Sequence, residues 1–196
     1  AAPWLRRPLS ILFSVGEEGL GNLRGVRQAV ADHPGPPHLL VSFDGSLDTV
    51  ALCGLGSRRY RVAVRCPGGH SWGNFGAPNA CEVLIRFLAA LREQYAALRQ
   101  ETQTVISFNI GTLAGGEGIN SIARRAEATF EFRSAAPDLL AAMDIGVTQV
   151  LQESKRHPDI DIELACIGER PAADAVERER LEPLAPIGRA SCRERV

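Results

Sequence analysis

The chain has 196 residues, of which 45% are hydrophobic, and a formal net charge of -1 at pH 7. These values are typical of a soluble globular protein with one or two domains. The arginines are scattered among acidic residues, which argues against nucleic-acid binding, and no apolar stretch approaches the roughly 18 residues of a membrane span. The five cysteines form no paired spacing, so we expect a reducing, cytoplasmic location.

The N-terminal part has the pattern of an α/β sheet. Residues 11–15 form an apolar run that predicts a buried strand, and residues 21–31 have the spacing of a helix. A second apolar run, 39–43, predicts another strand. Because strand, helix and strand follow one another, we expect residues 1–54 to be part of a catalytic α/β domain.

Each of these predicted strands ends in acidic residues beside glycine. The first is followed by Gly16-Glu17-Glu18-Gly19 and the second by Asp44. The carboxyl ends of strands are where open α/β sheets bind ligands, and two adjacent glutamates in a cleft favour a divalent cation. The alternative is that both acidic segments are solvated turns, which the residues alone do not exclude.

The segment 55–167 predicts a different unit, with the order β-α-β-β-α-β of a ferredoxin-like α+β domain. Asn79 is the expected N-cap of its first helix, and Pro137 is the expected first-turn residue of its second. The expected strands are 60–65, 104–113, 126–133 and 160–164, and the expected helices are 79–98 and 137–157. Residues 168–186 would lead back toward the catalytic domain. We expect residues 187–196 to be translated sequencing adaptor.

Three further residues stand where they could contact a substrate. His70 lies in a glycine-rich loop, where an imidazole could stabilise an oxyanion. Asn120 lies in a second glycine-rich loop, and Arg133 ends a predicted strand, where its guanidinium could bind a carboxylate in bidentate fashion. A surface salt bridge is the alternative for Arg133.

Taken together and in this order, these residues resemble metallopeptidase family 20. The family comprises dinuclear-zinc hydrolases such as carboxypeptidase G, aminoacylase, acetylornithine deacetylase, succinyl-diaminopimelate desuccinylase and peptidase T. The similar segments are the Glu17-Glu18 pair, the strand and turn from Arg61 to Ser71, and the glycine-rich loop from Ile110 to Ile122. The family's dimerisation domain also has the β-α-β-β-α-β order.

The resemblance implies a role for each candidate residue. Glu17 would be the general base and His70 the oxyanion-stabilising residue, which acts in the partner subunit's active site. Glu18 and Asp44 would be ligands of two zinc ions, for which cobalt or manganese could substitute. Asn120 and Arg133 would bind the substrate. The protein would form a homodimer through residues 55–167.

The family's His-x-Asp pair, its bridging aspartate and its final histidine ligand have no counterpart in this sequence. We therefore expect a fragment of a zinc-dependent hydrolase of small peptides or N-acyl amino acids, inactive on its own, with no membrane or nucleic-acid partner. The alternative is a non-catalytic ferredoxin-like module for dimerisation or ligand sensing.

Overall fold

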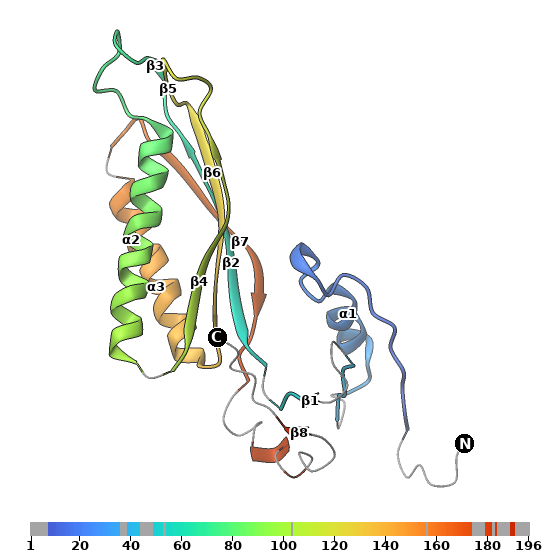
Figure 1. The fold of residues 1–196 in the computed structure, drawn as a ribbon. Helices are drawn as coiled ribbons and strands as arrows, with labels where there is room; N and C mark the ends of the chain where they lie inside the picture. The colour runs from blue at the N-terminus through green and yellow to red at the C-terminus, as the bar shows by residue number, and fades with distance from the viewer. Residues whose placement is uncertain are drawn as a thin grey trace. The chain divides into compact units, whose positions relative to one another are not determined.

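A computed structural model describes most of the chain: residues 8–35, 39–43, 49–52, 54–102, 104–155, 157–173, 179–181, 183 and 189–190. The chain divides into two compact units, Ala1–Leu47 and Asp48–Val196. Each unit is described by itself below (Figure 1). In the described residues, no helix is long and apolar enough to span a membrane.

The first unit contains the predicted helix but neither predicted strand. A 3-10 turn, η1 (Gly19–Gly21), leads into helix α1 (Arg24–Asp32). Residues 11–15 and 39–43 are not in strand conformation, and their large apolar side chains are exposed, Phe13 by 93%. The expectation of two buried strands is wrong for this structure. A strand requires a hydrogen-bonded neighbouring strand, and in the described residues neither segment belongs to a ladder.

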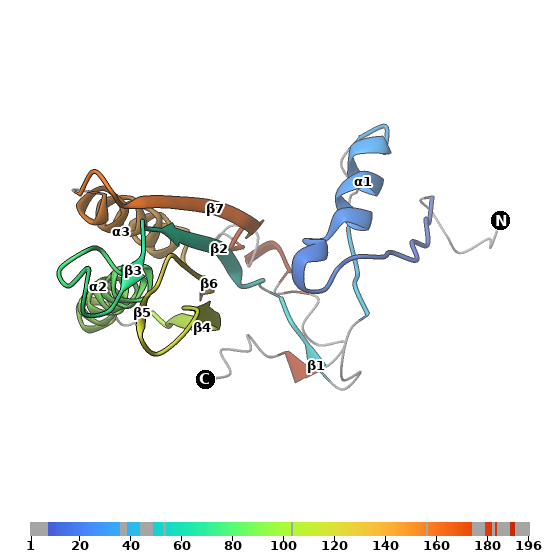
Figure 2. The same cartoon turned by 90° about the horizontal axis from the view of Figure 1, so that it is seen from above.

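The second unit confirms the ferredoxin-like α+β prediction. Its elements are β2 (Gly56–Arg65), α2 (Ala80–Glu101), β4 (Ile106–Gly115), β6 (Arg125–Ser134), α3 (Pro137–Ser154) and β7 (Asp161–Arg170). The four strands form one antiparallel sheet in the order β4-β6-β2-β7. Both helices cover the same face of this sheet (Figures 1 and 2).

The period-two pattern of the strands decides which side chains meet the helices. In β2, Val62 and Val64 are buried while Arg61 and Arg65 are exposed. The same alternation in β6 buries Phe130 and Phe132. The opposite face carries cross-strand ion pairs, listed here with their N–O distances: Arg59–Glu131, 3.2 Å; Arg61–Glu127, 2.9 Å; and Arg65–Asp161, 3.4 Å.

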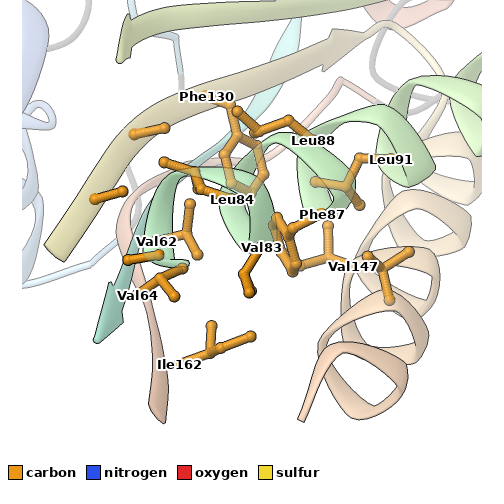
Figure 3. Packing of buried hydrophobic residues seen from close by; sticks show 14 of the residues in the cluster. Val62, Val64, Val83, Leu84, Phe87, Leu88, Leu91, Phe130, Val147 and Ile162 are labelled. Carbon is orange, nitrogen blue, oxygen red and sulfur yellow. The ribbon is translucent and has the colours of Figure 1, made fainter. Parts of the chain in front are cut away.

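The core lies between the sheet and the two helices (Figure 3). The apolar stripe predicted for α2 is buried: Val83, Leu84, Phe87, Leu88 and Leu91, with Leu98 partly buried beside them. These side chains pack against the aromatic rings of β6. The ring centroids of Phe87 on α2 and Phe130 on β6 are 6.2 Å apart. Burial of this apolar surface is the main stabilising contribution to the unit.

Local sequence features explain both helices. The Asn79 side chain accepts a hydrogen bond from the Cys81 amide at 3.0 Å, which confirms the predicted N-cap of α2. Pro137 is the first residue of α3. Gly146, which is unfavourable within a helix, faces α2: an added Cβ there would collide with Gln94 Oε1. The glycine therefore leaves the space that the Gln94 side chain of α2 occupies against α3.

Two further short ladders are present in this unit, and β7 extends beyond its predicted end. β3 (Gly69–His70) pairs with β5 (Ser121–Ile122), and β1 (Thr49–Val50) pairs with β8 (Arg189–Ala190). Residues 189–190 are the only described part of segment 187–196, whose adaptor origin stays a prediction. β7 continues to Arg170, so residues 168–170, expected to be a linker, complete the sheet instead.

Candidate functional site

His70 lies in a tight turn beyond the end of the main sheet. Its side chain is exposed, and the turn continues through Asn74. The Asn74 amide donates to the His70 carbonyl at 2.9 Å, and the His70 amide donates to Asn74 Oδ1 at 2.9 Å. His70 Nδ1 accepts from the Trp72 amide at 3.2 Å and from the Gly73 amide at 3.3 Å. The turn therefore holds both the backbone and the ring of His70.

Asn120 is brought to the same place by the ladder between β3 and β5. His70 pairs with Ser121, and the Ser71 amide donates to the Asn120 carbonyl at 2.9 Å. Figure 1 shows these two short strands together at one end of the sheet. The structure thus unites two predicted site residues that are far apart in the sequence.

The two loops expose large apolar side chains at this end. Trp72, Phe75 and Ile119 are almost fully exposed, at 86%, 89% and 105% of their reference areas. Apolar groups gathered in this way are typical of a surface that contacts another molecule. We use the name loop tip below for residues 70–76 together with residues 117–120.

Arg133 lies at the opposite end of the same sheet. It pairs across the sheet with Ser57, whereas Arg125, eight residues earlier in β6, lies at the end that carries the loop tip. At about 3.4 Å per residue, eight residues separate the two ends by about 27 Å. One copy of this domain therefore does not bring Arg133 together with His70 and Asn120.

The Arg133 guanidinium is bound to a carboxylate of its own strand. Nε donates to Glu131 Oε1 at 2.9 Å and Nη2 donates to Glu131 Oε2 at 3.1 Å. Arg59 Nε also donates to Glu131, at 3.2 Å. Burial favours the neutral acid, but the hydrogen bonds and charges of Arg133 and Arg59 outweigh it and lower the pKa of Glu131 below its ordinary value. A substrate carboxylate would have to compete with Glu131 for Arg133.

Glu17 and Glu18 lie in the first unit with exposed side chains. The Glu18 carbonyl accepts from the Gly21 amide at 2.9 Å, closing the 3-10 turn η1. Gly16 has a φ of 69°, and a Cβ at Gly21 would collide with the Gly16 carbonyl oxygen. The glycines therefore allow this tight turn, which presents the two glutamates to solvent.

A metal centre is not assembled by the described residues. Asp44, the second predicted zinc ligand, lies outside them, so its distance from Glu18 stays untested. Among the residues that the structure describes, no group of three or more histidine, cysteine, aspartate or glutamate side chains could hold a metal ion. Because a zinc site uses at least three protein ligands, these residues do not fit a zinc ion by themselves.

Two residues that the sequence analysis did not single out contribute to the site. Asn74 holds the turn around His70, and Glu131 binds the guanidinium of Arg133. The spacing of Asn74 after His70, within a glycine-rich segment, is compatible with a side chain that caps a turn. No local pattern indicated that Glu131 would face two arginines.

Comparison with known proteins identifies the type of domain formed by the second unit. The family model described as peptidase dimerisation domain matches residues 55–157. No curated protein sequence matches the chain.

Solved structures with a similar fold include an aminohydrolase, an amidase and an aminobenzoyl-glutamate utilization protein. A putative aminohydrolase from methicillin-resistant Staphylococcus aureus has a TM-score of 0.59 at 19% identity, covering 67% of this chain and 33% of that one. A hydantoinase/carbamoylase-family amidase from Burkholderia phymatum has a TM-score of 0.56 at 20% identity, with coverages of 71% and 35%. An aminobenzoyl-glutamate utilization protein from Klebsiella pneumoniae has a TM-score of 0.54 at 16% identity, with coverages of 72% and 37%. The chain spans about a third of the length of these proteins.

Proposed function

Because this chain belongs to metallopeptidase family 20, through a peptidase dimerisation domain at residues 55–157, we propose that it is part of an amide-cleaving hydrolase. Its substrates would be small peptides or N-acyl amino acids. The solved structures of similar fold include an amidase and an aminohydrolase, which supports the same reaction class. The proposal extends to a whole enzyme in which this chain is one segment.

The observation that carries the proposal is the location of the candidate residues at the two ends of one rigid sheet. His70 and Asn120 share the loop tip, while Arg133 lies at the other end of β6, about 27 Å from Arg125, at the end where the chain enters the domain. A site that uses all three residues therefore needs the loop tip of a second subunit. The exposed Trp72 and Phe75 are the kind of apolar surface that such an insertion would bury.

In this arrangement each side chain has a separate task. Glu17 accepts a proton from the attacking water, and Arg133 holds the free carboxylate of the substrate. His70 and Asn120 of the partner subunit donate hydrogen bonds to the oxygen that becomes negatively charged as the amide carbon turns tetrahedral. Such donors accelerate the reaction because they bind the transition state more strongly than the substrate.

Zinc is the cofactor we propose for the whole enzyme, with cobalt or manganese as substitutes. Glu18 and Asp44 would be two of its ligands, and the remaining ligands would come from segments outside this sequence. Because these two carboxylates fall short of a zinc site, we expect the 196-residue chain alone to be inactive and to bind zinc weakly. Tight, stoichiometric zinc binding in a calorimetric titration, abolished by Glu18→Gln, would contradict this expectation.

A homodimer follows from the composite site, and the edge strand β4 supports it. Among the strands that the structure describes, only β6 pairs with β4, and Ile110 and Leu113 on β4 are exposed by 38% and 60%. The other edge strand, β7, exposes acidic side chains such as Asp161 and Glu163. An unpaired edge with apolar side chains is suited to pairing with a second copy of itself.

The test of the function is a substitution of the proposed base in the whole enzyme. Glu17→Gln keeps the size of the side chain but cannot accept the proton, so kcat should fall by about a hundredfold or more while metal content is retained. Glu153→Gln, at an exposed position on α3, is the matched control and should leave kcat unchanged.

The alternative, a non-catalytic module for dimerisation or ligand sensing, predicts a different result. The wild-type whole protein would then show no hydrolysis of N-acyl amino acids or dipeptides. The Glu17→Gln variant would show the same absence of hydrolysis.

A further inference from the structure

The turn after β3 fixes the ring of His70 as well as its backbone. Two backbone amides, those of Trp72 and Gly73, converge on Nδ1 at 3.2 Å and 3.3 Å. A neutral imidazole has one donor and one acceptor nitrogen, and a nitrogen that accepts two N–H groups must carry the lone pair. A proton on Nδ1 would instead face two amide hydrogens.

We propose that Asn74 is a positioning residue that holds this turn closed and thereby keeps His70 as the Nε2–H tautomer. The ring then presents a single hydrogen-bond donor, Nε2–H, away from the turn. That a substrate oxygen receives this hydrogen bond rests on the proposed function, whereas the tautomer itself follows from the contacts within the turn.

Asn74 is suited to this role because it contacts both sides of the His70 backbone. Its backbone N–H donates to the His70 carbonyl, and its side-chain Oδ1 accepts from the His70 backbone N–H, each at 2.9 Å. The Asn74 carbonyl also accepts from the Ala77 amide at 3.0 Å, which continues the turn toward α2. These reciprocal bonds keep the Trp72 and Gly73 amides directed at the ring.

Gly69 leaves the space that Asn74 needs. Its φ is 148°, a conformation in the region that favours glycine, and an added Cβ would lie 2.6 Å from Asn74 Oδ1. Any side chain at this position would push the Asn74 amide group away from the His70 backbone. The backbone at Gly69 and the residues His70 and Asn74 thus form one mutually dependent unit.

An oxyanion hole benefits from such an arrangement because its donors need no reorganisation during the reaction. A histidine with a free ring would exchange tautomers and rotamers, and only a fraction of molecules would present Nε2–H at any moment. Holding the ring removes that loss, since effective activity scales with the fraction of the competent state.

The tautomer is measurable by NMR without any assay of activity. The chain is labelled with 13C,15N-histidine and studied at alkaline pH, about 8.5, because the two tautomers are forms of neutral histidine. Long-range 1H–15N correlations identify which ring nitrogen carries the proton, and His70→Ala assigns the signals. We expect His70 to be more completely in the Nε2–H form than in a peptide of residues 66–78. A population equal to that of the peptide would overturn the proposal.

Variants of Asn74 separate positioning from folding. Asn74→Ala should move the tautomer population toward that of the peptide, and in the whole enzyme it should lower kcat about tenfold with little change in KM. Asn74→Asp retains an acceptor oxygen and should restore the wild-type tautomer. Gln152→Ala removes an exposed amide side chain on α3 and is the control. A wild-type tautomer population in Asn74→Ala would refute the positioning role.

The two proposals can fail separately. If the NMR signature is as expected but the whole enzyme hydrolyses no amide, the positioning of His70 stands and the proposed function is wrong. If the enzyme is active but the His70 ring samples both tautomers, the function stands and this inference is wrong.

Discussion

At the residue scale, the contacts of Glu131 show how one carboxylate organises the open face of the sheet. It lies between Arg59 and Arg133, which would otherwise place two like charges close together on that face. Its side chain is 25% exposed, so its interactions with the two arginines are only partly screened by solvent. The lowered pKa of Glu131 means that the folded state favours its ionised form.

This leads to a prediction for stability as a function of pH. The pKa of Glu131 is lower in the folded state than its ordinary value of 4.5. Its ionised carboxylate therefore stabilises the fold fully at pH values above 4.5. That contribution is lost as pH falls through the folded-state pKa. We expect Glu131→Gln to lower the free energy of unfolding by roughly 1 kcal/mol at pH 7 and by progressively less as the pH falls below 4.5.

Urea unfolding at several pH values, followed by circular dichroism, measures this difference. The control is Glu163→Gln, whose carboxylate is 64% exposed and 3.6 Å from Arg65. It should change the unfolding free energy by a few tenths of a kcal/mol at most. Equal effects of the two substitutions would contradict the account of Glu131.

At the element scale, the packing of the Gln94 side chain of α2 against α3 uses the space left by Gly146. The glycine lies inside an 18-residue helix and is buried, and Gln94 Oε1 fills the space where a Cβ would lie. Glycine in a helix interior is less stable than alanine by about 1 kcal/mol, so the packing against α2 has to compensate for this cost.

A double-mutant cycle tests this interpretation. Gly146→Ala alone should give little or no stabilisation, because the gain in helix propensity is offset by displacement of the Gln94 side chain. In a Gln94→Ala background the same change should stabilise the domain by about 1 kcal/mol. Thermal unfolding of the four proteins gives the coupling energy, and additive effects would show that the two side chains do not interact.

The edge strand β4 gives a second prediction at this scale. Leu113→Lys places a charge on the exposed edge that we propose pairs with a second copy, so the dimer should dissociate at micromolar concentration. Ala165→Lys is the matched control, since Ala165 is exposed on β7 at the opposite edge. Sedimentation velocity distinguishes the two, and dissociation by the control but not by Leu113→Lys would assign the interface to β7.

At the scale of the whole molecule, the loop tip and Arg133 lie at opposite ends of one sheet. If each active site combines Glu17 of one subunit with His70 of its partner, two inactive variants can complement each other. A mixed dimer of Glu17→Gln and His70→Ala subunits contains one site with both side chains intact.

Random mixing makes about half of the dimers mixed, and each mixed dimer has one intact site out of two. About one quarter of wild-type activity should therefore be restored. The measurement is kcat after the two whole-enzyme variants are unfolded together and refolded in equal amounts. Each variant refolded alone provides the baseline. Activity that stays at this baseline would place Glu17 and His70 of the same subunit in one site.

The order of elements in the second unit followed from local patterns. Alternation in residues 60–65 and the helical stripe from Val83 to Leu91 each describe one face of one element, and burial confirmed both. The ordered motifs also identified the family, which the match to residues 55–157 confirmed. The roles of Glu17, Glu18, Asp44, His70, Asn120 and Arg133 stay predictions.

The sequence by itself thus determined the β-α-β-β-α-β order, because apolar periodicity is a property of neighbouring residues. It also determined the family, because short motifs in a fixed order can be read without a structure. Only the tertiary structure decided that His70 lies beside Asn120, that Glu131 binds Arg133, and that residues 11–15 form no strand. These outcomes depend on which segments pair and in what register. A hydrogen-bonding partner many residues away leaves no trace in the local pattern, so apolar character alone could not make a strand.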